Sequence, residues 1–278
     1  MPRPLMWSVR WLAGAQKCNI WSMLRAITHT VSPIIDKCEL TFIDRSPIDF
    51  QLATQQHNYY CAVLETLGII VNTLSENESY PDSCFVEDTA IVVDELAVIC
   101  SMGVPSRRGE TKLIERELSK YRSIVRIILP AMVEGGDVLR IGKRIFVGQS
   151  GRTNIEGIQE LTRILQPYGY KVVPVRTKDS LHLKSACSAI DDETLFVNPD
   201  WVELDGLKGV NLVYTPPEEP WSANVIRVGT TVCIQAGFPR AVELIGNVVR
   251  KVEIVDTSEL RKAEAGLTCS SIIFESTI

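Results

Sequence analysis

The stretch that decides the fold is GLTCSSIIF, residues 266–274, because its pattern recurs upstream. In it a polar residue of catalytic type, Cys269, stands at the head of a β-rich run. Counting back from Cys269, other polar residues head similar apolar stretches after 45, 42, 48 and 47 positions, at Asn224, His182, Glu134 and Glu87. Periods of about 20 to 50 residues indicate solenoids, propellers or other repeat arrays. The sequence therefore predicts a repeat protein.

Each of the four upstream residues leads into two β-rich runs that are separated by a short turn, the pattern of a β-hairpin. Cys269 leads into only one run before the chain ends, and we predict that its partner strand is AITHTV, residues 26–31. A last unit completed by the first strand closes a ring. We therefore expect an α/β fold, a five-bladed αβ-propeller of ββαβ-type repeats around a central pocket. The five equivalent residues are expected to face that pocket: Glu87, Glu134, His182, Asn224 and Cys269.

Between the hairpins, apolar residues recur at helical spacing, and a β-rich run follows each such segment. Asp49 is predicted to cap the first helix and Gly68 to end it. The third helix is predicted to open with a capping box, in which Thr153 and Glu156 bind each other's backbone N–H groups, and to turn Ile155 inward. The predicted helices are 49–67, 109–121, one that opens at 153, a short one at 201–207 and one around 241–248.

Five such units account for residues 25–278, which are predicted to form one catalytic domain. Residues 1–24 carry three basic residues, three Trp and no acid, and they precede the first predicted strand. They are interpreted either as a disordered extension or as an organellar targeting segment, which is basic and poor in acids. A targeting segment would direct the protein to mitochondria.

Composition narrows the classes of function. With 45% hydrophobic and 23% charged residues the chain resembles an ordinary globular protein, and its net charge of −5, without a polybasic run, argues against nucleic acid and favours a small cationic substrate. No apolar run approaches the length of a membrane span. Eight cysteines without a CxxC pair or metal-type spacing to the three histidines favour a reducing, cytoplasmic location. A homodimer is left open.

The predicted pocket holds the groups that nucleophilic catalysis requires. A thiol with an ordinary pKa near 8.5 is mostly protonated at neutral pH, so Cys269 needs a neighbouring base or cation. His182 is the candidate acid and base, and Glu134 is the candidate that orients it. The Gly135-Gly136 pair beside Glu134 is expected to let the backbone approach closely.

Charged residues around these three indicate the ligand. More carboxylates lie in the predicted pocket than an acid–base pair needs, and they suit a guanidinium, whose planar fork binds carboxylates two at a time. Two arginines at comparable places after consecutive hairpins, Arg107 and Arg152, would hold an anion. A guanidinium at one end and a carboxylate at the other describe arginine or an arginine derivative. The candidate acids are Asp82, Glu87, Asp88 and Asp137.

Seven motifs in order, from about residue 25 to the end, resemble the dimethylarginine dimethylaminohydrolase family. The resemblance implies a five-bladed αβ-propeller, hydrolysis of N-methylated arginines to citrulline and a methylamine, and no metal or organic cofactor. It also implies a nucleophile at Cys269, a proton donor at His182 and its partner at Glu134. The motifs are PDSCFVEDTAIV, VPSRRGE, VEGGDVL, GQSGRTN, LHLKSACS, AGFPR and GLTCSS.

The same resemblance implies how a substrate would be held. The guanidinium would meet Asp82, Glu87 and Asp88, the carboxylate would meet Arg107 and Arg152, and the backbone carbonyl of Ala263 would meet the amino group. One departure stands next to Ala263: the family often has Asp-Gly where this chain has Glu264-Ala265.

Two other functions are possible, that of an arginine deiminase and that of a non-catalytic arginine-binding protein. An arginine deiminase that acts on unmethylated arginine resembles this chain but carries an inserted helical domain, for which residues 25–278 leave no room. A non-catalytic arginine-binding protein would not require Cys269, His182 and Glu134 together. Turnover of methylarginine to citrulline distinguishes an enzyme from a binder.

Overall fold

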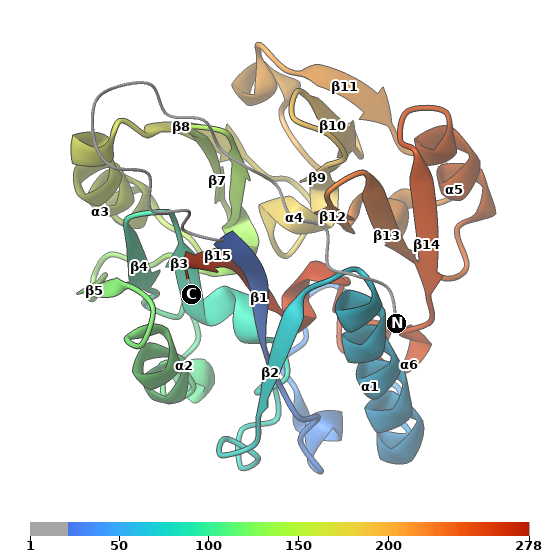
Figure 1. Cartoon of the computed structure of the whole chain (residues 1–278), viewed down its shortest axis with the longest axis horizontal. Coiled ribbons are helices and arrows are strands. Elements are labelled where there is room, and N and C mark those ends of the chain that lie inside the picture. The colour runs from blue at the N-terminus through green and yellow to red at the C-terminus, as the bar shows by residue number, and fades with distance from the viewer. Residues whose placement is uncertain (1–21, 278) are drawn as a thin grey trace.

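A computed structural model describes residues 22–277, and it arranges five three-stranded sheets around a common centre (Figure 1). In each sheet two strands pair antiparallel and the third is parallel to its neighbour. The predicted αβ-propeller is therefore confirmed. Four of the sheets are β3 (Ala90–Val92), β4 (Leu96–Ile99) and β5 (Ser123–Arg126); β6 (Val138–Ile141), β7 (Arg144–Gln149) and β8 (Lys171–Arg176); β9 (Cys187–Ala189), β10 (Thr194–Val197) and β11 (Asn211–Tyr214); and β12 (Val225–Val228), β13 (Thr231–Gln235) and β14 (Lys251–Val255).

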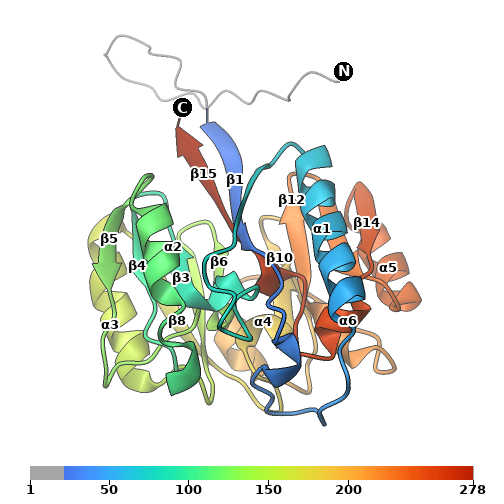
Figure 2. The same cartoon turned by 90° about the horizontal axis from the view of Figure 1, so that it is seen from below.

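The fifth sheet closes the ring with the two ends of the described chain. Strand β1 (Ser22–His29) pairs antiparallel with β15 (Ile272–Thr277), from Ser22 opposite Thr277 to Ile27 opposite Ile272. Its other edge pairs in parallel with β2 (Ile70–Leu74), so β1 is the central strand (Figure 1). Figure 2 shows β1 and β15 side by side. The predicted pairing of the first strand with the last is confirmed. Since β1 begins at Ser22, it starts inside the segment 1–24 that was predicted to be an extension. Residues 1–21 lie outside the described part of the chain.

Helices on the outside of the ring connect the second strand of most sheets to the third (Figure 1). Asp49 caps α1 by accepting the N–H groups of Gln51 and Leu52, and Gly68 ends it at a φ of 87°, as predicted. Between β10 and β11 the connection is only a 3₁₀ turn, Leu204–Leu207. The helices are α1 (Phe50–Thr66), α2 (Thr111–Leu118), α3 (Ile155–Leu165), α4 (Leu183–Ala186), α5 (Pro239–Gly246) and α6 (Ser258–Arg261).

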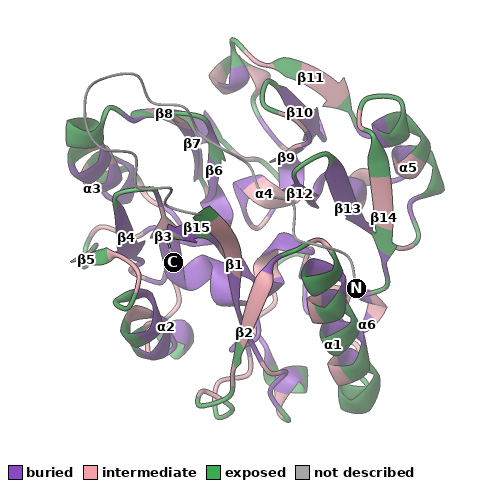
Figure 3. Ribbon diagram, in the orientation of Figure 1, coloured by how far each residue is buried: buried purple, intermediate pink, exposed green. Residues whose placement is uncertain are grey.

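The hydrophobic core is divided into clusters that lie between neighbouring sheets and their helices. In one of them, Val98 of β4, Ile145 of β7 and Leu161 of α3 pack together, and each is completely buried. In Figure 3 the strands near the centre are mostly buried, and the helices are exposed on their outer faces. Removing such a side chain down to Ala costs about 2–5 kcal/mol, so this cluster stabilises the packing of β4 against β7 and α3.

Two details of the helices differ from the prediction. The cap of α3 is Asn154, whose side chain accepts the N–H of Gly157, while the Thr153 hydroxyl accepts the N–H of Glu134 instead. The predicted capping box is therefore wrong, because the N–H of Glu134, at the start of the same repeat, takes the Thr153 hydroxyl. Ile155, predicted to point inward, is 43% exposed. None of the described helices is long and apolar enough to cross a membrane.

Candidate active site

A short helical turn precedes the hairpin of each of the five repeats and carries the residues that the period singled out. Glu87 lies within its turn and Cys269 at the middle of another, whereas Glu134 and His182 stand immediately before theirs and Asn224 immediately after. These turns meet around the centre of the ring. They are Val86–Thr89, Gly135–Asp137, α4 (Leu183–Ala186), Pro220–Ala223 and Thr268–Ser270.

A small cavity of about 20 Å³ lies where these turns meet. Seven of the predicted site residues line it directly: Asp82, Asp88, Arg107, Arg152, His182, Ala263 and Cys269. Glu87 and Glu134 lie behind the lining and bind residues in it or beside it. The cavity is lined by Glu39, Asp82, Phe85, Asp88, Arg107, Arg152, Leu181, His182, Ala263, Glu264, Ala265 and Cys269.

The imidazole of His182 is held by a buried carboxylate. Its Nε2 lies 2.8 Å from Oε2 of Glu134, which has no exposed surface. The other oxygen of Glu134 accepts the backbone N–H of Gly103 at 2.8 Å, and the hydroxyl of Thr153 accepts the N–H of Glu134 itself. A carboxylate fixed at both oxygens orients the ring, and the arrangement agrees with the predicted pairing of Glu134 and His182.

This environment favours the protonated form of His182. Burial by itself lowers the pKa of His182, but the Asp88 carboxylate, the hydrogen bond with Glu134 and the charge of Asp137 outweigh burial and raise the pKa to about 9. Nδ1 lies 3.7 Å from Oδ1 of Asp88, so negative charge faces both ring nitrogens. At neutral pH the ring is therefore an imidazolium, which can donate a proton.

Arg107 is a buried residue of the cavity lining, and most of its N–H groups donate to other residues of the protein. Its Nη1 donates to Asp88 at 2.7 Å, while Nε and Nη2 donate to Glu110 and Nη2 also donates to the Phe85 carbonyl. Burial raises the pKa of Asp88, yet the positive charges of His182 and Arg107 lower it to about 2. Asp88 is thus an anion at neutral pH. Arg107 therefore has few free N–H groups left for the carboxylate of a ligand.

Two other predicted binding residues, Asp82 and Arg152, also line the cavity. Asp82 accepts the backbone N–H of Glu39 at 3.2 Å, and burial raises the pKa of Asp82. Nη1 of Arg152 is 3.7 Å from Glu134, and Nη2 donates to the Thr41 hydroxyl at 3.3 Å. Neither contact uses the full fork of the Arg152 guanidinium, so it retains donors for an anion.

Beneath Cys269 is a polar network that the sequence did not predict. Glu87 forms a buried ion pair with Lys184 and accepts the hydroxyl of Thr268 at 2.6 Å. The Asn224 side chain binds both the hydroxyl and the N–H of Thr268, the residue before the cysteine. Asn224, singled out by the period, therefore supports the loop that carries the thiol.

The Cys269 thiol is protonated while the cavity is empty. Burial raises its pKa above the ordinary value, and the negative charges of Glu87 and Asp88 raise it further. A cation placed in the cavity would act in the opposite direction, because it stabilises the thiolate. The thiol is thus set to become reactive when a cationic ligand binds.

Gly136 allows the groups of the site to approach one another. A Cβ atom there would lie 2.6 Å from both Oδ1 of Asp88 and Nδ1 of His182. The N–H of Gly136 also donates to Oδ1 of Asp88 at 3.1 Å. The expected close approach at the glycine pair is confirmed.

Asp137 does not line the cavity, although it was counted among the acids for a cationic ligand. It is completely buried, and its oxygens accept the Leu183 N–H at 2.8 Å and the Ser150 hydroxyl at 2.6 Å. It therefore fixes the start of α4, directly after His182. Lys184 was missed altogether, since a single lysine in a short motif does not reveal that it points inward.

One group in the site has the composition of a metal site. Ligand atoms of Asp88, Glu134 and His182 lie within 4.8 Å of one another. A histidine binds a metal as the neutral imidazole. Because the pKa of His182 is raised to about 9, the proton competes with any metal for this ring at neutral pH.

Several known proteins that resemble this chain share one family name. The family model described as N,N dimethylarginine dimethylhydrolase, eukaryotic, matches residues 38–205. The N(G),N(G)-dimethylarginine dimethylaminohydrolase of Pseudomonas aeruginosa is 36% identical over 228 residues, which are 81% of this chain and 90% of that protein. The chain belongs to the dimethylarginine dimethylaminohydrolase family. The Streptomyces coelicolor dimethylarginine dimethylaminohydrolase is 32% identical over 89% of this chain and 96% of its own length.

Solved structures agree with this membership of the dimethylarginine dimethylaminohydrolase family. A cysteine-to-serine mutant of the Pseudomonas aeruginosa enzyme, complexed with citrulline, is 33% identical and superimposes with a TM-score of 0.85 over 91% of this chain and 99% of its own. A histidine-to-glycine dimethylarginine dimethylaminohydrolase, as an adduct with S-methyl-L-thiocitrulline, gives 0.86 at 33% identity over 91% of this chain and all of its own. The N-terminal domain of the arginine dihydrolase ArgZ, at 14% identity, shares the fold, with a TM-score of 0.79 over 90% of this chain and 97% of that one.

Proposed function

We propose that this protein hydrolyses N-methylated arginines, asymmetric dimethylarginine and monomethylarginine, to citrulline and dimethylamine or methylamine. The observation that carries the proposal is that a thiol and an imidazolium line one cavity together with the carboxylates of Asp82 and Asp88 and the guanidinium of Arg152. Family membership adds the substrate class, since relatives carry the name dimethylarginine dimethylaminohydrolase.

The guanidinium of the substrate is proposed to lie against Asp82 and Asp88, with Glu87 behind, and the carboxylate to lie at Arg152 with Arg107. The Ala263 carbonyl would accept the amino group. This placement puts the positive charge of the substrate beside Cys269. The charge offsets the negative potential that raises the thiol pKa, so the thiol loses its proton when the substrate is bound.

The first half of the reaction forms the adduct. The thiolate of Cys269 attacks the central guanidinium carbon, and a carbon–sulfur bond forms. His182, as imidazolium, gives its proton to the dimethylamino nitrogen, the carbon–nitrogen bond breaks, and neutral dimethylamine leaves. A cationic thiouronium group remains on the sulfur. Glu134 keeps the ring oriented throughout, since it binds Nε2.

The second half releases citrulline. His182, now neutral, takes a proton from water, and the resulting hydroxide adds to the same carbon. The carbon–sulfur bond then breaks, the sulfur leaves as thiolate, and the remaining proton on the oxygen passes to solvent. One residue thus acts as acid in one half and as base in the other, so its loss is expected to cost more than the roughly 10²–10⁴ of ordinary acid–base catalysis.

The test is to incubate the protein with asymmetric dimethylarginine, measure citrulline, and map the adduct by mass spectrometry after an acid quench. We expect an adduct on the peptide of Cys269, turnover that is abolished in Cys269→Ser, and unchanged turnover in the control Cys61→Ser. His182→Ala should still bind the substrate. Tight binding without citrulline would support an arginine-binding protein, and faster turnover of unmethylated arginine would support a deiminase.

The location is proposed from the cysteines. Every cysteine among residues 22–277 is free, which supports a reducing compartment such as the cytoplasm. A mitochondrial location depends on residues 1–24 and stays a prediction. A homodimer also stays a prediction. The proposed ligand is a small molecule, and each residue proposed to bind it comes from one chain.

A further inference from the structure

A segment of the loop before α1 lies across the catalytic cavity. This segment, residues 39–43, is called the strap. The Glu39 N–H donates to Asp82, and the Glu39 carboxylate accepts the hydroxyl of Ser106, the neighbour of Arg107. The Thr41 hydroxyl accepts a hydrogen bond from Nη2 of Arg152. The strap therefore contacts two of the residues that line the cavity, Asp82 and Arg152.

With the strap in this position the cavity is too small to hold a substrate. Its volume of about 20 Å³ is enough for about one water molecule. Sites for small organic ligands have volumes of about 300–1,000 Å³. An amino acid can therefore reach Cys269 only if part of the wall moves.

The strongest hold on the strap is a single carboxylate. Glu264 accepts the backbone N–H groups of three successive residues, Thr41 at 2.8 Å, Phe42, and Ile43 at 2.8 Å. Glu264 is only 7% exposed. Hydrogen bonds to a charged acceptor are about twice as strong as those between neutral groups, and three converge here. No other contact of the strap combines a charge with so many donors.

The backbone of Glu264 adopts an unfavourable conformation where its carboxylate binds the strap. Its φ is +57°, and among residues 22–277 it is the only residue other than glycine with a positive φ. That conformation is unfavourable for residues with a Cβ atom, and such outliers persist where the surrounding structure holds them. A glycine would remove the strain but also the side chain that binds the strap.

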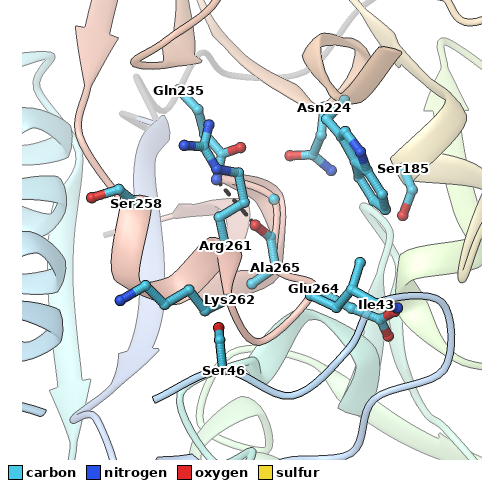
Figure 4. Close-up of a pocket in the computed structure, with 12 residues that line it drawn as sticks. Ile43, Ser46, Ser185, Asn224, Gln235, Ser258, Arg261, Lys262, Glu264 and Ala265 are labelled. Atoms are coloured by element: carbon cyan, nitrogen blue, oxygen red, sulfur yellow. Dashed lines mark hydrogen bonds between the residues drawn. The ribbon is translucent and has the colours of Figure 1, made fainter. Parts of the chain in front are cut away.

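Glu264 also forms the wall between the catalytic cavity and a larger neighbour. A cavity of about 430 Å³ is lined by Glu264 and Ala265, which line the catalytic cavity as well, and by Ile43 and Ser46 at and beyond the end of the strap. In Figure 4 the Glu264 side chain lies against Ile43 at one side of this larger cavity. The contact between Glu264 and the strap thus lies between the two.

We propose that Glu264 is the latch of the strap, and that its release opens the catalytic cavity into the larger neighbouring cavity, by which the substrate enters. When the latch closes again, Glu39 and Thr41 return to Asp82 and Arg152 and set these two side chains around the substrate. Glu264 is a positioning residue in this scheme, because it acts through the strap. The part that concerns the substrate rests on the proposed function.

Limited proteolysis tests the latch without any substrate. Trypsin cleaves after Lys37 and Arg45, which flank the strap, and mass spectrometry can follow these two bonds separately. In Glu264→Gln the charge is lost and an amide N–H₂ group faces backbone donors, so cleavage after Arg45 should become about tenfold faster or more. Glu264→Asp keeps the charge on a shorter side chain and should lie between Glu264→Gln and wild type.

Glu219→Gln is the matched control. The buried Glu219 carboxylate also accepts two backbone N–H groups, those of Arg240 and Ala241 at the start of α5, away from the strap. Its loss should not accelerate cleavage after Arg45. Equal rates in Glu264→Gln and wild type, or equal acceleration in Glu264→Gln and Glu219→Gln, would overturn the latch.

Kinetics then test the link to the substrate. In Glu264→Gln, KM for asymmetric dimethylarginine should rise more than kcat falls, and iodoacetamide should alkylate Cys269 faster than in wild type. Citrulline should slow cleavage after Arg45 in the wild-type protein. Faster cleavage with unchanged KM and unchanged alkylation would refute a role of the latch in access to the site. If the protein proves inactive on methylarginine, the proteolysis and alkylation results still decide the latch.

Discussion

Folded His182 holds a proton that unfolded His182 loses, so the protein should become less stable as the pH rises from about 7 to 8.5. The pKa of His182 is about 9 in the folded chain, whereas an unfolded histidine titrates near 6.5. Between these values the folded chain holds one proton more than the unfolded chain, so the free energy of unfolding falls by about 1.4 kcal/mol per pH unit. The stabilisation is complete below about 6.5 and is lost as the pH passes through about 9. Between about pH 7 and 8.5 the free energy of unfolding is expected to fall by about 2 kcal/mol.

Other shifted groups titrate mainly outside this window. Burial lowers the pKa of His29, and it lowers that of His57 to about 4, so both change charge at acidic pH. Burial raises the pKa of Glu110 only to about 7. Burial also raises the pKa of all seven cysteine thiols among residues 22–277, so their combined effect on stability grows only as the pH approaches the ordinary thiol value of about 8.5.

The assay is urea denaturation at several pH values in this window, combined with NMR titration of the histidine ring protons. The chain has 3 histidines, so the signals can be assigned by substitution. Glu134→Gln removes the carboxylate 2.8 Å from Nε2, so the pKa of His182 should fall and the slope of stability against pH should flatten. Glu219→Gln, which removes a different buried carboxylate, should keep the slope.

Two results would refute this reasoning. Stability that does not change between about pH 7 and 8.5 would show that His182 carries no extra proton in the folded state. A ring signal of His182 that titrates at or below about 6.5 would show that burial outweighs Asp88 and Glu134. In either case His182 would begin the proposed reaction as a base, and the order of its two roles would have to be reversed.

Three further predictions concern other parts of the molecule. Arg152→Ala should raise KM for asymmetric dimethylarginine with little change in kcat, and steady-state kinetics that show a collapse of kcat at constant KM would contradict its assignment to the substrate carboxylate. Gly136→Ala should lower turnover by about 100-fold or more, because its Cβ would lie 2.6 Å from Asp88 and His182, whereas Gly151→Ala, with no atom within 4 Å, should be fully active. Deletion of residues 1–21 should leave Tm and turnover nearly unchanged, since β1 begins at Ser22 and both its edges are paired; a fall in Tm of many degrees would contradict this.

The architecture could be predicted because each repeat carries its own signals. The spacing of Glu87, Glu134, His182, Asn224 and Cys269 is visible in one sequence, and so is the alternation of hairpins and amphipathic helices. The pairing of β1 with β15 followed from counting, since the last unit lacked a strand. Helices α4 and α6 were missed because four residues are too few to show a helical period.

Contacts made by individual side chains could not be predicted in the same way. Thr153 and Asn154 are both good helix caps, and the choice between them depends on the N–H of Glu134, which lies at the start of the same repeat. The sequence predicted a pocket that contains Arg107, but not that Asp88 and Glu110 take up its donors. Lys184 gave no signal, because only the packed structure shows that it meets Glu87.

The closure of the ring by β15 also affects the order in which the protein is made. Cys269 and β15 are translated after the other strands of the ring, while the edge of β1 that receives β15 is translated before them. Until β15 has been synthesised, the nascent chain has an unfilled strand edge and no nucleophile in the cavity. A prematurely terminated product is therefore both prone to associate through that edge and unable to form the covalent adduct, so the proposed activity and the completed ring arise together.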